Sequence, residues 1–235
     1  MTEQPGNLLR WLAQALFGLG LAAAGWRTPT PPPAMLPPIP ASHPAAHLAA
    51  HLAGDDLPAA ARASPERPSR TRLANGQAAV AWLENGEAES AGIRLAIRDA
   101  TGWREMGRIA SRETTAASAF LHAQRLGRPL LWAEGGWLHL WYEAHPLGSA
   151  AGAVLMHSVS TDGGRQWTNA RRLDSTPFGG LGPRLGETLR PLADGGLLLP
   201  LAQAGGDGPW LRLSVTGQLI DRLPALPAAV AETPR

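Results

Sequence analysis

The sequence predicts an all-β fold, built from about three similar units of antiparallel strands that follow one another between residues 73 and 223. The first observation behind this prediction is an internal repeat, in which three similar segments carry evenly spaced turn glycines, Gly76, Gly136 and Gly196. The second is the order within each unit, where the turn leads into a strand, a loop of small residues, another strand, a tight turn and a third strand. Together they predict turn-linked antiparallel meanders.

Each expected element can be located in the printed sequence. The strands that follow the glycine turns lie in the segments 74–87, 133–146 and 193–206. The next strands cover 93–99, 153–160 and 210–216, tight turns follow at 100–102, 161–164 and 216–218, and the last strands cover 103–109, 167–173 and 219–223. A meander of this size cannot cover its own apolar faces, so neighbouring units must stack as propeller blades do.

An apolar segment, Trp11–Trp26, precedes the repeats and carries no charge between Arg10 and Arg27. It is short for a spanning helix, which needs roughly 20 apolar residues, and it suits a secretory signal that is cleaved before Gly25. A retained anchor, with Arg10 reaching the headgroups, and an amphipathic or buried helix are the alternatives. We therefore expect residues 1–27 to be a signal peptide or membrane anchor and the chain to be exported, either periplasmic or anchored to the inner membrane.

Residues 28–72 form the expected linker, rich in Pro and Ala and largely disordered. The stretch Thr28–Pro44 contains too many prolines for helix or sheet and is expected to be an extended spacer. Ala45–Ala61 is expected to form a short helix and Ser64–Arg72 a loop, and neither stretch has the character of a core segment. Residues 224–235 are expected to be a tail.

Four potential metal ligands in this linker, His43, His47, His51 and Asp55, are spaced so that a helix would place them on one face. Pro44 interrupts the first interval, and the glutamate that would act as a base between two such histidines is missing. We therefore expect a solvated helix and predict neither a metal site nor a cofactor.

The composition excludes several classes of function. The chain has no cysteine, which rules out disulfides, thiolate metal sites and a cysteine nucleophile. All 21 basic residues are arginines, and with 19 acidic residues they leave a formal charge of +2. The arginines are scattered among the acids and form no basic stripe, so we expect no nucleic-acid partner.

The strongest motif is Ser160-Thr161-Asp162-Gly163-Gly164-Arg165-Gln166-Trp167, which fits the pattern S-x-D-x-G-x-x-W. The carboxylate of Asp162 can accept backbone N–H groups across a hairpin turn, Gly164 can supply a positive φ, and Trp167 can pack its ring into the unit. The motif, called an Asp-box, is therefore expected to be a structural device formed by Ser160, Asp162, Gly164 and Trp167. Its aspartate is not expected to act as a catalytic acid.

This motif and the segments that begin at Leu126, Gly148 and Pro191 resemble the bacterial sialidase (neuraminidase) family, whose Asp-boxes are also called BNR repeats. The resemblance implies a partial sialidase-type β-propeller of about three blades. Members of that family are six-bladed and cut terminal sialic acid from glycans. They use an arginine cluster for the sugar carboxylate, an aspartate as acid/base and a tyrosine nucleophile activated by glutamate.

The catalytic set that the resemblance implies does not map onto this chain. Glu87 stands where similar sequences carry an arginine, and Arg184 and Arg190 are out of register with a second arginine position. Tyr142 lies within an alternating strand, which favours a packed aromatic over a nucleophile. Arg112 and Glu113 are the weak candidates that remain, because they resemble a short Arg-Glu segment of the family; the alternative interpretation is an exposed ion pair in a loop.

Two functional hypotheses follow from the resemblance. The first is a sialidase-like protein that hydrolyses terminal sialic acid or a related acid sugar. The second is a catalytically inactive, truncated propeller module that binds a glycan or a protein partner. About three blades would also leave the ring open, so we expect self-association through unpaired blade edges.

Overall fold

The computed structural model describes residues 14–17, 57–84, 91–147, 153–173, 184–186, 189–203 and 206–224. The chain divides into two compact units, Met1–Met35 and Leu36–Arg235. The first contributes a single helical turn over residues 14–17, and all described strands belong to the second. Within the described ranges, no helix has the length and apolarity needed to cross a membrane. The proposed cleavage site, the Pro-rich spacer, the histidine row of the linker and the tail beyond Pro224 lie outside the described residues.

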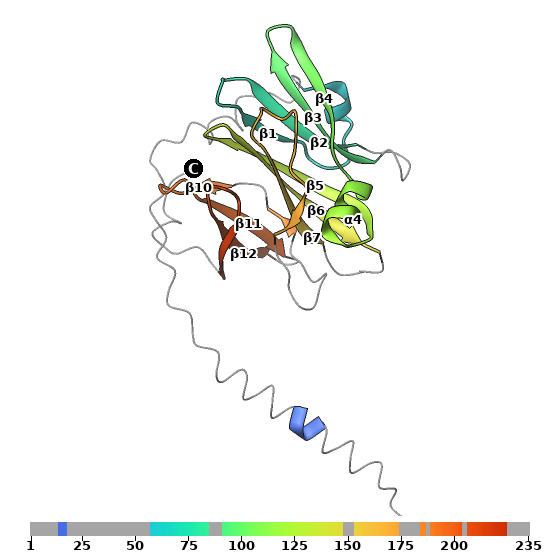
Figure 1. The fold of residues 1–235 in the computed structure, drawn as a ribbon, viewed down its shortest axis with the longest axis vertical. Helices are drawn as coiled ribbons and strands as arrows, with labels where there is room; N and C mark the ends of the chain where they lie inside the picture. Colours follow the sequence, from blue (N-terminus) through green and yellow to red (C-terminus); the bar gives the residue numbers. More distant parts are fainter. Residues whose placement is uncertain are drawn as a thin grey trace, which may run out of the picture. The chain divides into compact units, whose positions relative to one another are not determined.

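Strands dominate the second unit, and the described strands form three antiparallel sheets (Figure 1). The first sheet contains, in spatial order, β1 (Ser69–Arg72), β2 (Ala78–Glu84), β3 (Gly92–Asp99) and β4 (Gly102–Ser111). The second contains β5 (Ala123–Glu134), β6 (Trp137–Pro146), β7 (Val154–Ser160) and β8 (Arg171–Arg172). The third contains β10 (Arg190–Pro191), β11 (Leu197–Gln203), β12 (Gly206–Leu213) and β13 (Leu219–Leu223), and β9 (Arg184–Leu185) also pairs with β11. Two helices, α3 (Ala59–Arg62) and α4 (Arg112–Ala119), complete the list of described elements in this unit.

The predicted all-β meanders are confirmed, and each has an additional strand, β1, β5 or β10, before the glycine turn. The third sheet also gains β9 beside β11. We expected Ser64–Arg72 to be a loop, which is wrong for Ser69–Arg72, because these residues pair with Ala78–Ala81 as β1. The strand was not predicted because its residues, Ser-Arg-Thr-Arg, are all polar and show no apolar alternation. Its hydroxyl groups face β5, where Ser69 Oγ accepts the N–H of Leu131 at 2.8 Å and Thr71 Oγ1 accepts that of Ala133 at 3.1 Å.

The glycine turns are alike in the first and third sheets and different in the second. The N–H of Gly76 donates to the carbonyl three residues earlier at 2.9 Å, and Gly195 makes the same bond at 3.0 Å. Gly195 is therefore the structural counterpart of Gly76, one position before the glycine that sequence spacing selects. In the second sheet Glu134 pairs with Trp137, so only Gly135 and Gly136 form the turn, with φ of 56° and 89°. All four of these glycines have positive φ, which explains their residue type, whereas Gly196 does not.

The sheets stack face to face, as blades of a propeller do. Because side chains alternate along a strand, β6 contributes to two separate cores. Leu138, Leu140 and Tyr142 pack with buried residues of β2 and β3 in the core between the first and second blades. Trp141 packs instead with leucines of β11 and β12 in the core between the second and third blades. The fold is thus a partial propeller of three blades, two with four strands and the third with five, in agreement with the sequence prediction of about three blades.

The outer face of the first blade is covered by the segment that precedes β1. Leu57 and Ala61 are buried against Val80, Trp82 and Ala96. The sequence indicated no core residue in this stretch, and for these two residues that expectation is wrong. The Ala and Leu residues of this segment show no alternation that would indicate burial. They are buried because they cover an apolar face of the first blade that would otherwise be exposed to water.

Candidate functional site

The Asp-box forms the turn between β7 and the last strand of the second blade. Asp162 Oδ1 accepts the N–H groups of Arg165 at 3.0 Å and Gln166 at 2.9 Å, and the hydroxyl of Ser160 at 2.8 Å. These hydrogen bonds, led by the one from Gln166, lower the pKa of Asp162, because each favours its charged form. All of this bonding serves the turn, so the carboxylate has a structural task.

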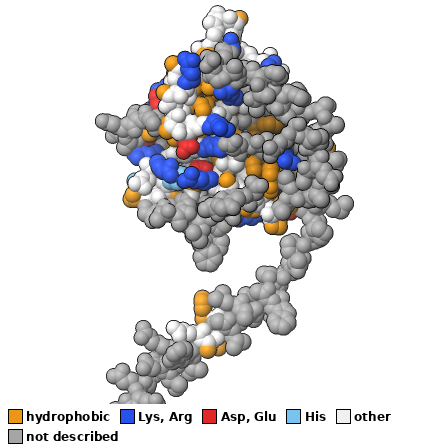
Figure 2. Space-filling view, turned by 180° about the vertical axis from the view of Figure 1, so that it is seen from behind, with side chains coloured by type: hydrophobic (Ala, Val, Ile, Leu, Met, Phe, Trp, Pro, Cys, Tyr) orange, Lys and Arg blue, Asp and Glu red, His pale blue; other side chains and the backbone are white. Residues whose placement is uncertain are grey.

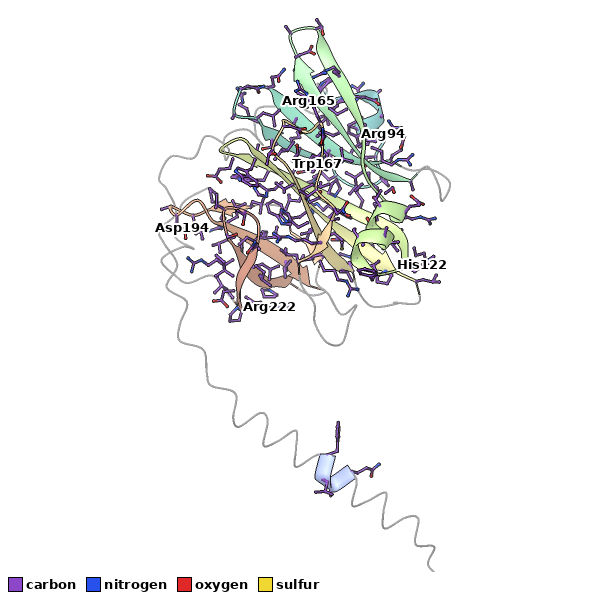
Figure 3. The ribbon with its side chains drawn as sticks, viewed as in Figure 1. Arg94, His122, Arg165, Trp167, Asp194 and Arg222 are labelled. Carbon is purple, nitrogen blue, oxygen red and sulfur yellow. The ribbon has the colours of Figure 1, made fainter. Side chains whose placement is uncertain are left out.

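The glycine and tryptophan of the Asp-box hold this turn against the first blade. Gly164 has a φ of 90°, and a Cβ atom added there would lie 2.6 Å from Leu95 Cδ2 of β3. Trp167 Nε1 donates to the carbonyl of Gly164 at 3.1 Å, and its ring packs against the first core. Figure 3 shows Arg165 and Trp167 beside the strands of the first blade. The motif therefore joins two blades.

The equivalent turns of the other blades keep parts of this arrangement. In the first blade Asp99 Oδ1 accepts the N–H of Thr101 at 2.8 Å, and Gly102 has a φ of 128°. In the third blade Gly217, with a φ of 73°, lies directly against His157 of the second blade, as Gly164 lies against Leu95. The turns of the second and third blades thus each pack on the third strand of the preceding blade.

The two weak site candidates lie at the start of α4 and not in a loop. The helix begins with a capping box between Ser111 and Thr114. Glu113 is exposed in the first turn, and its pKa is lowered chiefly by hydrogen bonding to its own backbone N–H and to Ser111. Arg112 turns toward β5, where Nη1 donates to the carbonyl of Gln124 at 2.9 Å. The neighbouring side chains therefore have different surroundings, and only Arg112 reaches the start of β5.

A buried carboxylate that the sequence did not single out lies next to this point. Glu143 of β6 is 5% exposed, and its Oε1 accepts the N–H of Leu185 in β9 at 2.7 Å. Its Oε2 lies 3.3 Å from Nε2 of His145. A Cβ atom at Gly127 would lie 2.8 Å from the same oxygen, so a glycine at the bulge in β5 leaves room for the carboxylate.

Arg125 of β5 extends the polar contacts of Glu143 and His145. Its Nη2 lies 3.4 Å from Nδ1 of His145. A guanidinium can only donate, so Nδ1 must accept and Nε2 must carry the proton that His145 donates to Glu143. One series of contacts therefore runs from Arg125 of β5 through His145 and Glu143 of β6 to Leu185 of β9. The Arg112 contact lies beside its start, at the neighbouring residue Gln124. We call Arg112, Arg125, Glu143 and His145 the β5 entry cluster.

The tyrosine beside this cluster is unsuited to nucleophilic attack. Tyr142 is fully buried, and its hydroxyl lies 2.8 Å from Thr115 Oγ1 of α4. Burial raises its pKa to about 12, so the phenolate is disfavoured at neutral pH. Its side chain belongs to the first core, as its alternating position indicates.

The other arginines considered from the sequence lie elsewhere. Arg184 is exposed on β9, and the guanidinium of Arg190 lies 5.4 Å from the ring centre of Trp210, a cation–π contact within the third blade. Glu87 lies outside the described residues. Among the residues that the structure describes, no three His, Asp or Glu side chains gather as metal ligands.

Solved structures with a similar chain path are glycoside hydrolases at low identity. An α-L-arabinanase of Penicillium chrysogenum is 16% identical, with 67% of this chain and 50% of that one covered and a TM-score of 0.47. An α-L-arabinofuranosidase of Fusarium graminearum is 13% identical, with 67% and 48% covered and a TM-score of 0.48. An exo-β-1,3-galactanase of Clostridium thermocellum is 11% identical, with 66% and 36% covered and a TM-score of 0.49. The matched part thus spans half or less of each of these proteins, and such matches do not establish what this chain acts on.

No curated protein matches the chain significantly. A family model does match, and it covers residues 76–225, which is more than half of the sequence and includes all three glycine turns and the Asp-box. By this match the chain belongs to the family described as the BNR repeat-like domain.

Proposed function

We propose that this chain is a glycan-directed propeller module that binds a terminal acid sugar, sialic acid or a relative of it, at the β5 entry cluster. The observation that carries the proposal is that two groups of polar contacts reach adjacent residues at the start of β5: Arg112 of α4 contacts the carbonyl of Gln124, and Arg125 leads to His145 and the buried Glu143 of β6. The family membership and the resemblance to sialidases supply the substrate class. Figure 2 shows one face of the molecule on which arginine side chains gather around acidic ones.

The chemistry of the cluster suits a carboxylate ligand. Planar guanidinium groups hold a carboxylate through two parallel hydrogen bonds. Arg112 uses Nη1 for the backbone carbonyl of Gln124, which orients its guanidinium, and among the described contacts its buried Nε has no acceptor. A buried donor without a partner is costly, so a small rearrangement that lets a water or a ligand oxygen reach this Nε would be favourable. Arg125 lies next in sequence to the same carbonyl and is exposed.

Binding without hydrolysis is the better supported of the two functional hypotheses. Hydrolysis by the sialidase route needs an accessible tyrosine, and Tyr142 is buried and bonded to Thr115. Glu143 is committed to the backbone of β9 and is nearly inaccessible. Hydrolytic activity therefore remains the second hypothesis, and it would require groups beyond those described here.

The test measures binding and turnover together. Titration calorimetry with an α-sialoside should show binding by the wild type and at least a tenfold loss for Arg112→Ala, which is about 1.4 kcal/mol. Arg104→Ala is the matched control, because that arginine is exposed on the first blade and pairs with Asp99 at 3.9 Å. Equal affinity of wild type and Arg112→Ala would contradict the proposed site. Release of a fluorophore from a fluorogenic sialoside, abolished in Arg112→Ala, would favour the hydrolytic hypothesis.

We also propose that the chain is exported, on the strength of the apolar segment in residues 1–27. Mass spectrometry of the protein made in a bacterial host distinguishes the alternatives. A mature N-terminus at Gly25 supports a cleaved signal, and an intact chain in the membrane fraction supports an anchor. An intact chain in the cytosolic fraction would contradict export.

Self-association through open blade edges is proposed from the last strand. In β13 the apolar side chains of Leu219 and Ile220 are exposed, and exposed apolar edge strands favour pairing with another chain. Light scattering should show a mass above that of the monomer, which Ile220→Lys should reduce. A monomer at all concentrations would contradict the proposal.

A further inference from the structure

Two histidines are buried where the second and third blades meet. His139 of β6 and His157 of β7 are 1% and 2% exposed. They belong to a column of stacked rings, in which His139 lies 5.3 Å from Trp141, His157 lies 5.2 Å from Trp141, and the two imidazoles lie 5.4 Å from each other. The proposed glycan site does not use them.

Hydrogen bonding fixes the protonation of both rings. Arg171 of β8 approaches Nδ1 of His157 with Nε and Nη2, each at 3.3 Å. Because arginine only donates, Nδ1 of His157 accepts, and its Nε2 carries the proton. That proton is donated to Nδ1 of His139, 3.1 Å away. Both imidazoles are therefore neutral, and a further proton on either ring would place two donors against each other.

The third blade depends on this arrangement. Gly217, in the turn between β12 and β13, lies directly against the His157 ring, and a Cβ atom there would come within 3.2 Å of Nδ1 of His139. Arg171 also donates from Nη2 to the carbonyl of Thr216 in the same turn, at 3.3 Å. The turn thus rests on the neutral pair and on the guanidinium that orients it.

The charged group that faces the pair is cationic. Arg171 is the charged side chain whose field acts on both histidines, and the stacked neighbours on β6 and the backbone of the third-blade turn carry no charge. Burial and Arg171 lower the pKa of His139 to about 4. Burial, His139 and Arg171 lower the pKa of His157 to about 3. No carboxylate is among the described partners of the pair that could stabilise an added proton.

We propose that the His139–His157 pair is an acid-sensitive latch, which keeps the third blade closed on the second at neutral pH and releases it when either ring takes up a proton. The sign of the effect follows from linkage. An exposed histidine has a pKa of about 6.5, so between that pH and about 4 the open state binds protons that the closed state excludes. The contribution of the pair to closure is fully present above pH 6.5 and weakens as the pH falls below it.

The expected size can be worked out from the same values. If opening exposes both rings, the opening equilibrium rises about tenfold per histidine between pH 8 and pH 5.5, or about 100-fold for the pair. Hydrogen exchange of the amides in β12 and β13, corrected for the intrinsic pH dependence of exchange, measures this opening directly.

The decisive variant keeps the hydrogen bonds and removes the titration. In His157→Gln the amide oxygen can accept from Arg171 and the amide nitrogen can donate to residue 139, while His139→Asn keeps an acceptor at the position of Nδ1. The double variant should show the same corrected exchange at pH 8 and pH 5.5. His122→Gln, at an exposed histidine outside the pair, should keep the full acid response of the wild type.

The proposal is contradicted if corrected exchange in β12 and β13 of the wild type is unchanged between pH 8 and pH 5.5. It is equally contradicted if a folded double variant opens in acid as much as the wild type. Should the double variant fail to fold, His157→Gln alone serves, with an expected acid response of about tenfold in place of 100-fold. Glycan binding does not enter any of these measurements, so their outcome is independent of the proposed function.

Discussion

The contact between the Asp-box turn and the first blade can be tested by adding one methyl group. Gly163 and Gly164 both have positive φ, 75° and 90°, but only Gly164 faces another residue closely. Alanine at either position meets the strain of the left-handed region, about 1–2 kcal/mol. In Gly164→Ala the new Cβ atom would also lie 2.6 Å from Leu95 Cδ2, and overpacking of a buried contact costs about 1–3 kcal/mol more.

We therefore expect Gly164→Ala to reduce the free energy of unfolding by about 1–3 kcal/mol more than Gly163→Ala does. Urea denaturation at neutral pH, followed by tryptophan fluorescence, measures both values. A double-mutant cycle with Leu95→Ala assigns the difference, since removing the isobutyl group leaves space for the new methyl group. If Gly164→Ala costs the same with leucine or alanine at position 95, the turn does not pack on the first blade as described.

Three further predictions concern single residues. Phe120 follows the last residue of α4 with a φ of 51° and is 96% exposed, so Phe120→Gly should stabilise the protein by about 0.5 kcal/mol in urea denaturation. Ala117→Gly, within the same helix, should instead destabilise it by about 1 kcal/mol. If both variants are destabilised, the left-handed conformation of Phe120 does not strain the helix end. Glu143→Gln should lower the free energy of unfolding by about 2 kcal/mol, because a neutral amide accepts more weakly from the N–H of Leu185 and directs a donor toward the N–H of His145. Unchanged stability would show that the buried carboxylate contributes little to folding. The pKa of Asp162 is lowered in the folded chain, so its stabilising contribution is present above the unfolded pKa near 4 and is lost as the pH falls through the folded pKa. Asp162→Asn should therefore flatten the dependence of the free energy of unfolding on acidic pH. An unaltered pH profile in this variant would contradict a stabilising role of the carboxylate.

The blades could be predicted from the sequence because their strands follow local rules. Alternation of apolar and polar residues identified β6 and β7, and the glycine turns and the Asp-box marked where strands reverse. β1 was missed because its residues are polar and bond to β5 through their hydroxyl groups, which no local pattern records. The sequence repeat also aligned Gly196, and not its neighbour Gly195, with Gly76. The turn of the second blade is formed by two residues only, so equal spacing in the sequence does not correspond to equal positions in the three turns.

The site was less accessible to sequence reasoning. Arg112 was found through the family resemblance. Its hydrogen-bond partner is a backbone carbonyl, which cannot be predicted from residue types because every residue has one. Glu143 depends on Leu185, which is 42 positions away in the chain. The sequence did contain one indication of the site. Every second residue of a strand projects to the same face, and along β6 these residues are His139, Trp141, Glu143 and His145. Polar residues on a face that must be covered by the next blade indicate either a buried network or a site; His139 belongs to a buried network, and Glu143 and His145 belong to the proposed site.

Acid-sugar recognition at the β5 entry cluster can be tested most directly with two ligands, of which one carries the acid sugar and the other lacks it. Titration calorimetry of the wild type with an α-sialoside and with the same glycan lacking the sialic acid measures whether the cluster recognises the acid sugar. We expect the sialoside to bind at least tenfold more tightly than the neutral glycan, with this preference lost in Arg112→Ala. Equal affinity for the two ligands, or a preference that survives in Arg112→Ala, would contradict acid-sugar recognition at this cluster.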